Sequence, residues 1–245
     1  MSVCHAAVVE IPRGDFAQHL LSNGFWLNVT VLGDLCWAIA YVLIIVQCFR
    51  QRTYGLPLVA IAMNFTWELQ YSLVQPPRCD DGSVDMVKAA MILAWAALDA
   101  VIVFQLFRWG RAQQAIDEIQ KHFPLIVAGS LLLAAAGNLA FARFHPDEAA
   151  PLSGLIINFV MSLLFIFLLF ARPALQGIGW GASLFRVAGN SVIFIANIFL
   201  LQANKPSMRG FVMFLFVGTA IFDVIYLTLL HARRSALRTG AVATA

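Results

Sequence analysis

Charged residues are scarce in this sequence: they make up 12% of its 245 residues, whereas a typical soluble domain carries about 25%. Hydrophobic residues make up 61%, and the mean hydropathy is +0.81. A chain with so little charge cannot cover a water-exposed surface with polar groups, which excludes a soluble enzyme and a disordered protein. The net charge of +3 is too small to indicate a nucleic-acid partner. Lipid is therefore the expected solvent for most of the chain.

Cysteine is also scarce, and no C-x-x-C pair occurs. The four cysteines are Cys4, Cys36, Cys48 and Cys79. Two of them fall inside the first apolar stretch, so their spacing supports neither a zinc site nor a disulfide framework. The N-terminal segment lacks the uninterrupted apolar core of a signal peptide, because Glu10, Pro12, Arg13 and Asp15 interrupt it. We expect this segment to belong to the mature protein.

Seven stretches are long and apolar enough to cross a bilayer core, which takes about 20 helical residues. They cover residues 27–49, 56–75, 84–107, 123–144, 152–171, 184–203 and 211–231. Prolines stand at the junctions: Pro76 and Pro77 close the second span, Pro124 opens the fourth and Pro173 ends the fifth. There is no convincing internal repeat. The pattern predicts an all-α polytopic membrane protein, with residues 1–245 forming one seven-helix bundle around a central acidic and aromatic cavity.

Lysine and arginine are unevenly divided between the two sets of loops, with nine on one side and five on the other. Cytoplasmic loops carry the excess of basic residues in membrane proteins. The richer side includes Arg108, Arg111, Arg233 and Arg234. We therefore expect a multi-pass protein with its N-terminus outside the cytoplasm and its C-terminus in the cytoplasm.

Four acidic residues fall inside the predicted spans: Asp34, Glu68, Asp99 and Asp223. Placing a charged carboxylate at the bilayer centre costs about 2.5–3.5 kcal/mol on insertion scales. Only one basic residue, Arg186, lies near the middle of a span, so the four acids cannot all be paired with a cation. Some of them are therefore expected to hold a proton at neutral pH. Such an acid in a dry cavity can donate that proton to a substrate.

Aromatic and amide side chains follow these acids at helical spacing, which places them on the same helix faces. The residues that we expect to line the cavity and bind substrate are Trp37, Tyr41, Asn64, Trp67, Tyr71, Trp95, Asn158, Arg186, Asn190 and Tyr226. Each polar residue also has a structural explanation, because lone aspartates and asparagines in spans often hold helices together through hydrogen bonds. Four acids together argue against a purely structural role.

A neutral acid facing aromatic walls suits one reaction class. The acid can protonate an alkene or epoxide, and the faces of Trp and Tyr can stabilise the resulting carbocation. Asp80, Asp81 and Asp85 resemble the D-D-x-x-D motif that binds diphosphate through metal, but they have one residue too many and lie in a loop. No D-x-D-D motif occurs either. We therefore expect the trigger to be protonation, with no metal and no cofactor.

The segment Asn64-Phe65-Thr66-Trp67-Glu68 resembles the N-x-x-W-E signature of small seven-helix membrane terpene cyclases, which include fungal meroterpenoid and indole-diterpene cyclases and bacterial drimentine-type relatives. Further similar segments run from the first span to the last: 33–37 with Tyr41, Trp95 with Asp99, Asn158 with Ser162, and 222–226. The resemblance implies that Glu68 and Asp223 are the catalytic acids. Asp34 and Asp99 would complete the acidic network.

These observations favour an isomerase- or lyase-type cyclase that folds a linear farnesyl-type chain, with a terminal alkene or epoxide, into fused rings. Its partners would be a lipophilic prenylated substrate and the lipid bilayer, with no nucleic acid. The alternative is a proton-coupled transporter of a small solute that uses the same acids, which the many aromatics and the missing repeat disfavour. A retinal photoreceptor is strongly disfavoured, since Lys88, Lys121 and Lys205 all lie at or near span ends.

Overall fold

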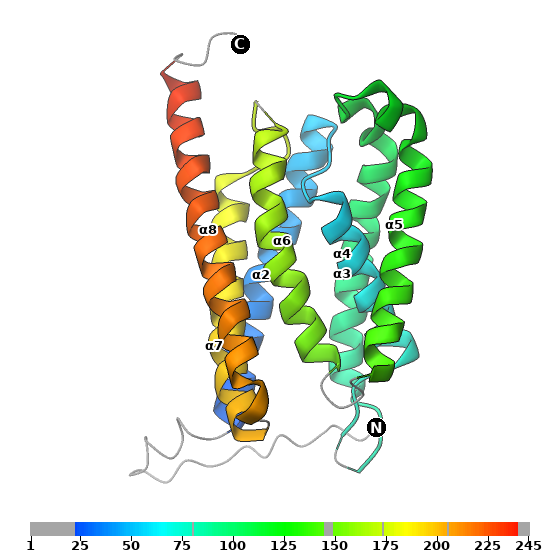
Figure 1. The fold of residues 1–245 in the computed structure, drawn as a ribbon, viewed down its shortest axis with the longest axis vertical. Coiled ribbons are helices and arrows are strands. Elements are labelled where there is room, and N and C mark those ends of the chain that lie inside the picture. Colours follow the sequence, from blue (N-terminus) through cyan, green and yellow to red (C-terminus); the bar gives the residue numbers. More distant parts are fainter. Residues whose placement is uncertain (1–22, 80, 145–148, 173, 205, 240–245) are drawn as a thin grey trace.

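The computed structural model describes residues 23–79, 81–144, 149–172, 174–204 and 206–239 of the chain. Within these ranges it contains seven α-helices, labelled α2 to α8 as in Figure 1, and no strand. The helices are α2 (Asn23–Gln51), α3 (Leu58–Leu69), α4 (Met86–Trp109), α5 (Asp117–Phe144), α6 (Ala149–Phe170), α7 (Trp180–Asn204) and α8 (Arg209–Arg238). Each corresponds to one of the seven predicted spans, so the all-α class is confirmed.

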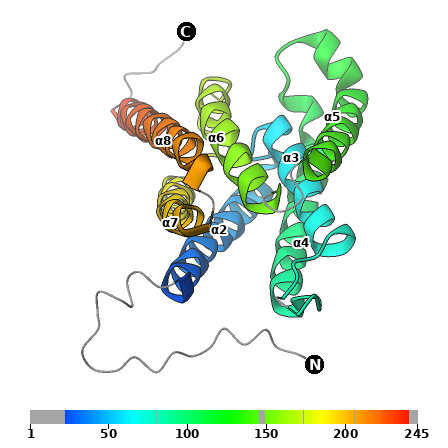
Figure 2. The ribbon, with the colours of Figure 1, turned by 60° about the horizontal axis from the view of Figure 1, so that its bottom comes forward.

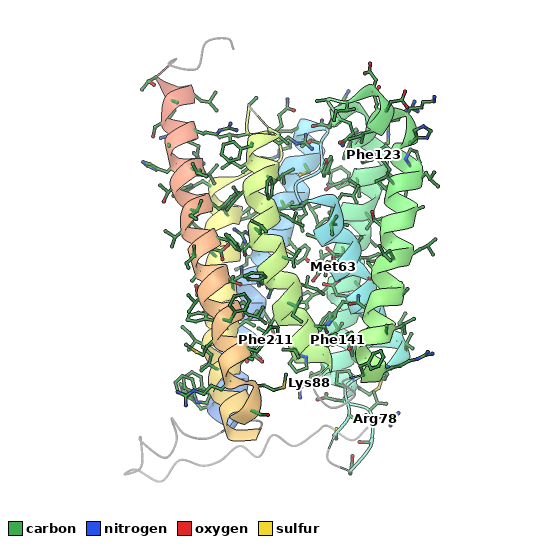
Figure 3. All side chains as sticks on the ribbon, viewed as in Figure 1. Met63, Arg78, Lys88, Phe123, Phe141 and Phe211 are labelled. Atoms are coloured by element: carbon green, nitrogen blue, oxygen red, sulfur yellow. The ribbon has the colours of Figure 1, made fainter. Side chains whose placement is uncertain are left out.

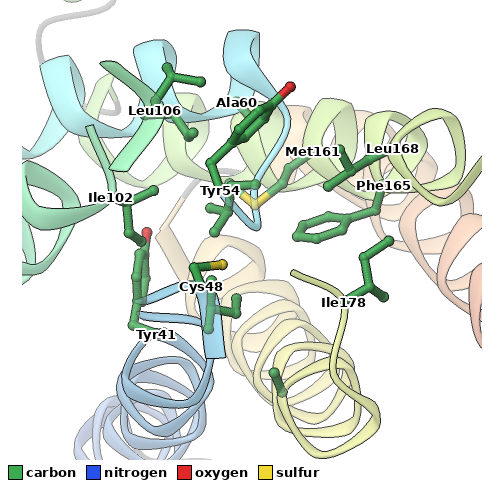
Figure 4. Close-up of a cluster of buried hydrophobic side chains, with 14 of the residues drawn as sticks. Tyr41, Cys48, Tyr54, Ala60, Ile102, Leu106, Met161, Phe165, Leu168 and Ile178 are labelled. Carbon is green, nitrogen blue, oxygen red and sulfur yellow. The ribbon is translucent and has the colours of Figure 1, made fainter. Parts of the chain in front are cut away.

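The helices form two groups that lie side by side (Figures 1 and 2). In one group α2 packs along α7, α7 packs on α8, and α8 packs on α6. In the other, α3 lies between α4 and α5. The groups meet where α2 contacts α4 and where α3 contacts α6. We call this boundary the seam, and its core includes Tyr41 beside Ile102 of α4 (Figure 4).

Apolar side chains cover the outside of the bundle, and many polar ones lie inside. Leu132 and Leu133 of α5 are 73% and 76% exposed, whereas Asp99 and Asp223 are 0% and 2% exposed. Six helices of the described chain are long and apolar enough to cross a membrane. Arg78 and Lys88 lie at one end of the bundle (Figure 3). An apolar outer surface is what a lipid solvent requires, and apolar side chains also form most of the buried core.

The second predicted span is built from two different helix types. The α-helix α3 ends at Leu69 and continues directly as a π-helix, η1 (Gln70–Val74). The Ser72 hydroxyl donates to the Glu68 carbonyl oxygen at 2.6 Å. Asn138 of α5 donates to the Met63 carbonyl oxygen at 3.1 Å. Single π-turns inside helices are rare and are frequent at functional sites, and this one begins two residues after Glu68.

Two glycines allow α2 and α7 to approach closely. A Cβ atom on Gly33 would lie 2.6 Å from Cγ1 of Ile193, and one on Gly189 would lie 2.7 Å from Cδ1 of Trp37. Any side chain at either position would force the helices apart. Small residues at such contacts are typical of membrane helices, whose association depends on close packing.

The start of α5 differs from the prediction. Pro124 was expected to open the fourth span, but α5 begins at Asp117 and holds Pro124 inside its third turn. Asp117 and Glu118 lie in the first turn, where acidic side chains interact favourably with the helix dipole. The helix therefore tolerates the loss of one backbone hydrogen bond at Pro124.

The cysteine spacing supported no disulfide framework, but Cys79 is disulfide-bonded. Cys36 and Cys48 are free thiols. Cysteine spacing along the chain does not show which segments meet in space, and for this reason the pattern was uninformative. Cys4, Asp80 and most of the expected mature N-terminal segment lie outside the described residues.

Candidate active site

Two of the predicted acids meet at the seam, in a cluster that we call the acid pair. It contains Glu68 of α3, Asp99 of α4, Asn64 of α3 and Tyr41 of α2. The Asn64 amide nitrogen lies 2.8 Å from Oε1 of Glu68, 2.9 Å from Oδ2 of Asp99 and 2.7 Å from the Tyr41 hydroxyl oxygen. An amide NH₂ group has only two hydrogens to donate, so it cannot satisfy all three acceptors at once.

The acid pair contains no cation. The carboxyl groups of Glu68 and Asp99 lie close enough to interact directly. Neither takes part in an ion pair with a described residue. Glu68 Oε2 and Asp99 Oδ1 are both buried without a hydrogen-bond partner. Two contacting carboxyl groups in this setting cannot both ionise without strong repulsion.

A second cluster, the ion-pair cluster, lies between α2, α6, α7 and α8. Arg186 Nη1 lies 2.8 Å from Oδ1 of Asp223 and donates to the Ser162 hydroxyl at 3.1 Å. The Asn190 amide donates to Oδ2 of Asp223 at 3.0 Å, and its oxygen accepts from Trp37 Nε1 at 3.1 Å. All five side chains are buried. Asp223 is therefore both neutralised and hydrogen-bonded.

Aromatic rings cover the cation of this cluster. The Arg186 Cζ atom lies 4.3 Å from the ring centroid of Phe165 and 4.9 Å from that of Tyr226. The Tyr226 hydroxyl pairs with the Ser183 hydroxyl at 2.9 Å. Cation–π contacts are strongest where water is excluded, so these rings help to keep the guanidinium buried.

The two clusters are neighbours along α2 rather than parts of one chamber. The rings of Trp37 and Tyr41 lie 5.8 Å apart, and Trp37 contacts the ion-pair cluster while Tyr41 contacts the acid pair. A cavity beside Arg186 and Tyr226 has a volume of about 10 Å³, which is the space of about one water molecule. A prenyl chain does not fit there. Helical periodicity predicted which faces point inward, but it cannot show how tightly side chains fill the space between them.

The remaining predicted residues lie outside both clusters. Trp67 Nε1 donates to the Ser153 hydroxyl of α6 at 2.8 Å, and the Tyr71 ring lies 5.0 Å from the Trp67 ring. The hydrogen bond between Trp67 and Ser153 holds α3 against α6. The half-buried residues Asp34, Trp95 and Asn158 make no side-chain hydrogen bond with another described residue.

The predicted site omits two hydroxyl groups, that of Ser162 in the ion-pair cluster and that of Ser183 beside it. Sequence reasoning names Ser162 only as a neighbour of Asn158, and it omits Ser183. Ser183 stands three residues before Arg186 on α7, so the same helical spacing that selected the other residues could have found it.

The loop before α4 gives its acids local roles. Asp81 accepts hydrogen bonds from the Ser83 hydroxyl at 2.6 Å and the Ser83 backbone N–H at 2.9 Å, which lower the pKa of Asp81. Asp85 caps α4 by accepting from the Lys88 N–H at 3.1 Å. Among the described residues, no three His, Cys, Asp or Glu side chains are grouped so that they could hold a metal ion.

Comparison with known proteins matches nearly the whole chain to one family. The family model of Pyr4-like transmembrane terpene cyclases covers residues 16–235. The Pyr4-family terpene cyclase mfmH of Annulohypoxylon moriforme is 27% identical over 212 residues, or 81% of this chain and 82% of the relative. The terpene cyclase cle7 of Aspergillus versicolor is 26% identical, with 75% of each chain covered. The terpene cyclase pyr4 of Aspergillus fumigatus is 25% identical, with 80% and 81% covered. No solved structure matches.

Proposed function

Because this chain belongs to the Pyr4-like transmembrane terpene cyclases, we propose that it cyclises a linear farnesyl-type chain by protonating a terminal alkene or epoxide. Family membership already identifies it as a membrane enzyme of the terpene cyclase type, which disfavours the proton-coupled transporter. The observation that carries the proposed mechanism is the acid pair, in which two buried carboxyl groups meet without a cation.

Glu68 is the proposed proton donor. One proton shared between Glu68 and Asp99 removes the repulsion between two carboxylates and leaves an acidic O–H in a buried site. Asn64 holds Oε1 of Glu68, while Oε2 is buried without a hydrogen-bond partner, so a proton on it can pass to a substrate only when the substrate enters the seam. The proton passes from Glu68 to the terminal carbon of an alkene or to the oxygen of an epoxide. The positive charge then forms on carbon, and the ring bonds close onto it.

Asp223 is proposed as the second catalytic acid, with a role different from that of Glu68. Its partners are Arg186 and Asn190 rather than Glu68. An ionised carboxylate of this kind is suited to accept the proton that the last carbocation loses. This step balances the first, because one proton enters the substrate at one cluster and one leaves it at the other.

The aromatic side chains between the clusters are proposed to stabilise the carbocation. Trp37 and Tyr41 connect the two clusters directly, and Trp67 and Tyr71 form the wall beside α6. Trp95, Tyr226, Asn158 and Asp34 are proposed to line the remaining path. Because the cavity beside Arg186 and Tyr226 is only about 10 Å³, binding of a prenyl chain there requires the helices around it to separate.

The proposed orientation places the C-terminal end of α8 in the cytoplasm. Arg233 and Arg234 lie near that end of the chain, as the positive-inside bias requires. The disulfide-bonded Cys79 lies in the loop before α4, and disulfides persist in oxidising compartments outside the cytosol. The loop that contains Cys79 is on the proposed non-cytoplasmic side. The substrate would reach the enzyme from the bilayer.

Purified protein in lipid nanodiscs, supplied with farnesyl and epoxyfarnesyl substrates with and without EDTA, tests this function. We expect cyclic products that persist in EDTA and that fall at least about a hundredfold in Glu68→Gln, the lower range for loss of a general acid. Glu118→Gln is the matched control, since Glu118 is an exposed residue whose ion-pair partner is His122. A strict requirement for magnesium, or full activity in Glu68→Gln, would contradict the mechanism.

A further inference from the structure

The guanidinium of Arg186 has more donors than partners. Its Nη1 atom makes the contacts with Asp223 and Ser162, whereas Nε and Nη2 are buried without a hydrogen-bond partner. An arginine carries five N–H donors, and leaving buried donors unpaired lowers stability. One edge of this side chain therefore lacks an acceptor.

The same side chain lines the cavity of about 10 Å³. Phe165 of α6 and Ile178, which precedes α7, form apolar walls and lie near each other (Figure 4). The polar wall residue Ser183 is already engaged, because its hydroxyl donates to the Gly179 carbonyl oxygen at 2.8 Å and pairs with Tyr226. The space suits a single oxygen atom, and the unpaired groups beside it are donors. The cavity is therefore complementary to one acceptor oxygen.

The charge of the cluster selects a neutral acceptor. Asp223 already compensates the charge of Arg186 at 2.8 Å, so an anion in the cavity would add an uncompensated negative charge to a lipid-embedded interior. A carbonyl oxygen accepts two hydrogen bonds without adding charge.

We propose that this cavity is a subsite for the head group of the substrate, in which Nε and Nη2 of Arg186 donate to one neutral carbonyl oxygen on the group that carries the prenyl chain. The inference rests on the proposed function. Ile44 lines the cavity and stands three residues after Tyr41 on α2, and the Tyr41 hydroxyl contacts the acid pair. A chain whose head is held at Arg186 can therefore direct its far end along α2 towards the acid pair. The two clusters thus bind opposite ends of one molecule.

Binding of two matched probes tests the subsite without turnover. The probes are 4-farnesylacetophenone and farnesylbenzene, which share the chain and ring and differ in the acetyl group. Their affinities are measured by quenching of tryptophan fluorescence in nanodiscs. We expect the wild-type protein to bind the ketone at least about tenfold more tightly, as for one hydrogen bond to a charged donor.

Two substitutions are expected to remove this preference. Ala182→Val adds methyl groups to a buried wall of the cavity without changing any charge, and Arg186→Lys removes the two-donor edge. Ala188→Val is the matched control, because Ala188 lies on α7 but faces outward, and it should keep the wild-type ratio. If Arg186→Lys does not fold, Ala182→Val alone decides.

Equal affinities in the wild-type protein, or a ketone preference that survives in Ala182→Val, would overturn the inference and assign the cavity to water. The proposed function fails differently, because it predicts cyclic products. A protein that prefers the ketone but yields no product from any prenyl substrate would contradict the function and leave the head-group subsite standing.

Discussion

The acid pair and the ion-pair cluster use similar groups to opposite effect. Both are buried and both join several helices, but the acid pair joins the consecutive helices α2, α3 and α4, whereas the ion-pair cluster joins α2 to the later helices α6, α7 and α8. In the ion-pair cluster, Asp223 faces a guanidinium at 2.8 Å and an amide donor at 3.0 Å. In the acid pair, a single amide group serves two carboxyl groups and a hydroxyl. In the ion-pair cluster the charge of Asp223 is compensated by Arg186, whereas the acid pair is stable only if one of its two carboxyl groups holds a proton.

The largest expected effect comes from breaking the ion pair. Arg186→Met leaves the Asp223 carboxylate buried without a cation, which should lower the free energy of unfolding by about 3–5 kcal/mol. Denaturant titration in detergent micelles measures it. The double variant Arg186→Met/Asp223→Leu should recover much of the loss. Lys88→Met is the control, because Lys88 is 58% exposed in its pair with Asp85 and such pairs contribute less than about 1 kcal/mol.

Breaking the acid pair should affect activity without lowering stability. Asp99→Asn removes the carboxyl group that shares a proton with Glu68, so we expect cyclisation to slow by about a hundredfold. The free energy of unfolding should stay unchanged or rise, because the contact between two acids is gone. Product formation and denaturant titration on the same preparation test both parts. A loss of stability as large as that in Arg186→Met would show that the two clusters are alike.

The glycine contact between α2 and α7 should support only the ion-pair cluster. Gly189→Ala places a methyl group about where Trp37 stands, 2.7 Å from its Cδ1 atom, and overpacking of this kind destabilises by about 1–3 kcal/mol. Gly129→Ala on α5 is the matched control, since a Cβ atom there meets nothing within 4 Å. Thermal unfolding compares them, and equal melting temperatures would contradict the packing argument.

The smallest expected effect concerns the hydroxyl that joins α2 to the acid pair. Tyr41→Phe keeps the ring beside Trp37 but removes an acceptor of the Asn64 amide at 2.7 Å. We expect a loss of at most about 1 kcal/mol, the value of one hydrogen bond, because the Asn64 amide keeps two acceptors for its two hydrogens. Denaturant titration measures it, with Tyr54→Phe, which removes the hydroxyl that accepts from Gln114 at 3.2 Å, as the comparison. A loss of stability in Tyr41→Phe larger than that in Gly189→Ala would contradict this expectation.

Much of the fold follows from the sequence because a spanning helix must present about 20 mostly apolar residues to lipid. That requirement locates all seven helices, and it fails at α5 because residues 117–122 are largely polar and extend the helix beyond its apolar part. Nothing in the apolar pattern separates α3 from the π-helix that follows it. The extra residue in a π-turn changes the backbone register without changing hydropathy.

The sequence identified most of the residues of the candidate site, but it did not show which of them contact each other. Helical spacing places Asn64 and Glu68 on one face, and the structure brings both to Asp99. The pairing of Asp223 with Arg186 depends on how α7 packs against α8, which no local pattern records. Asp34 shares a helix face with Trp37, yet it stays outside both clusters, since Gly33 brings α7 close on that side of α2.

The close contact of Gly33 with Gly189 also bears on how a lipid-borne molecule reaches the interior. Lateral access from a bilayer requires two adjacent helices to part, and these two lie backbone against backbone, with a Gly33 Cβ position only 3.1 Å from the Gly189 carbonyl oxygen. This close packing favours α2 and α7 moving together as one unit. A lipophilic substrate therefore has to enter between another pair of helices. Gly33 and Gly189, which carry no side chains, determine that α2 and α7 stay in contact.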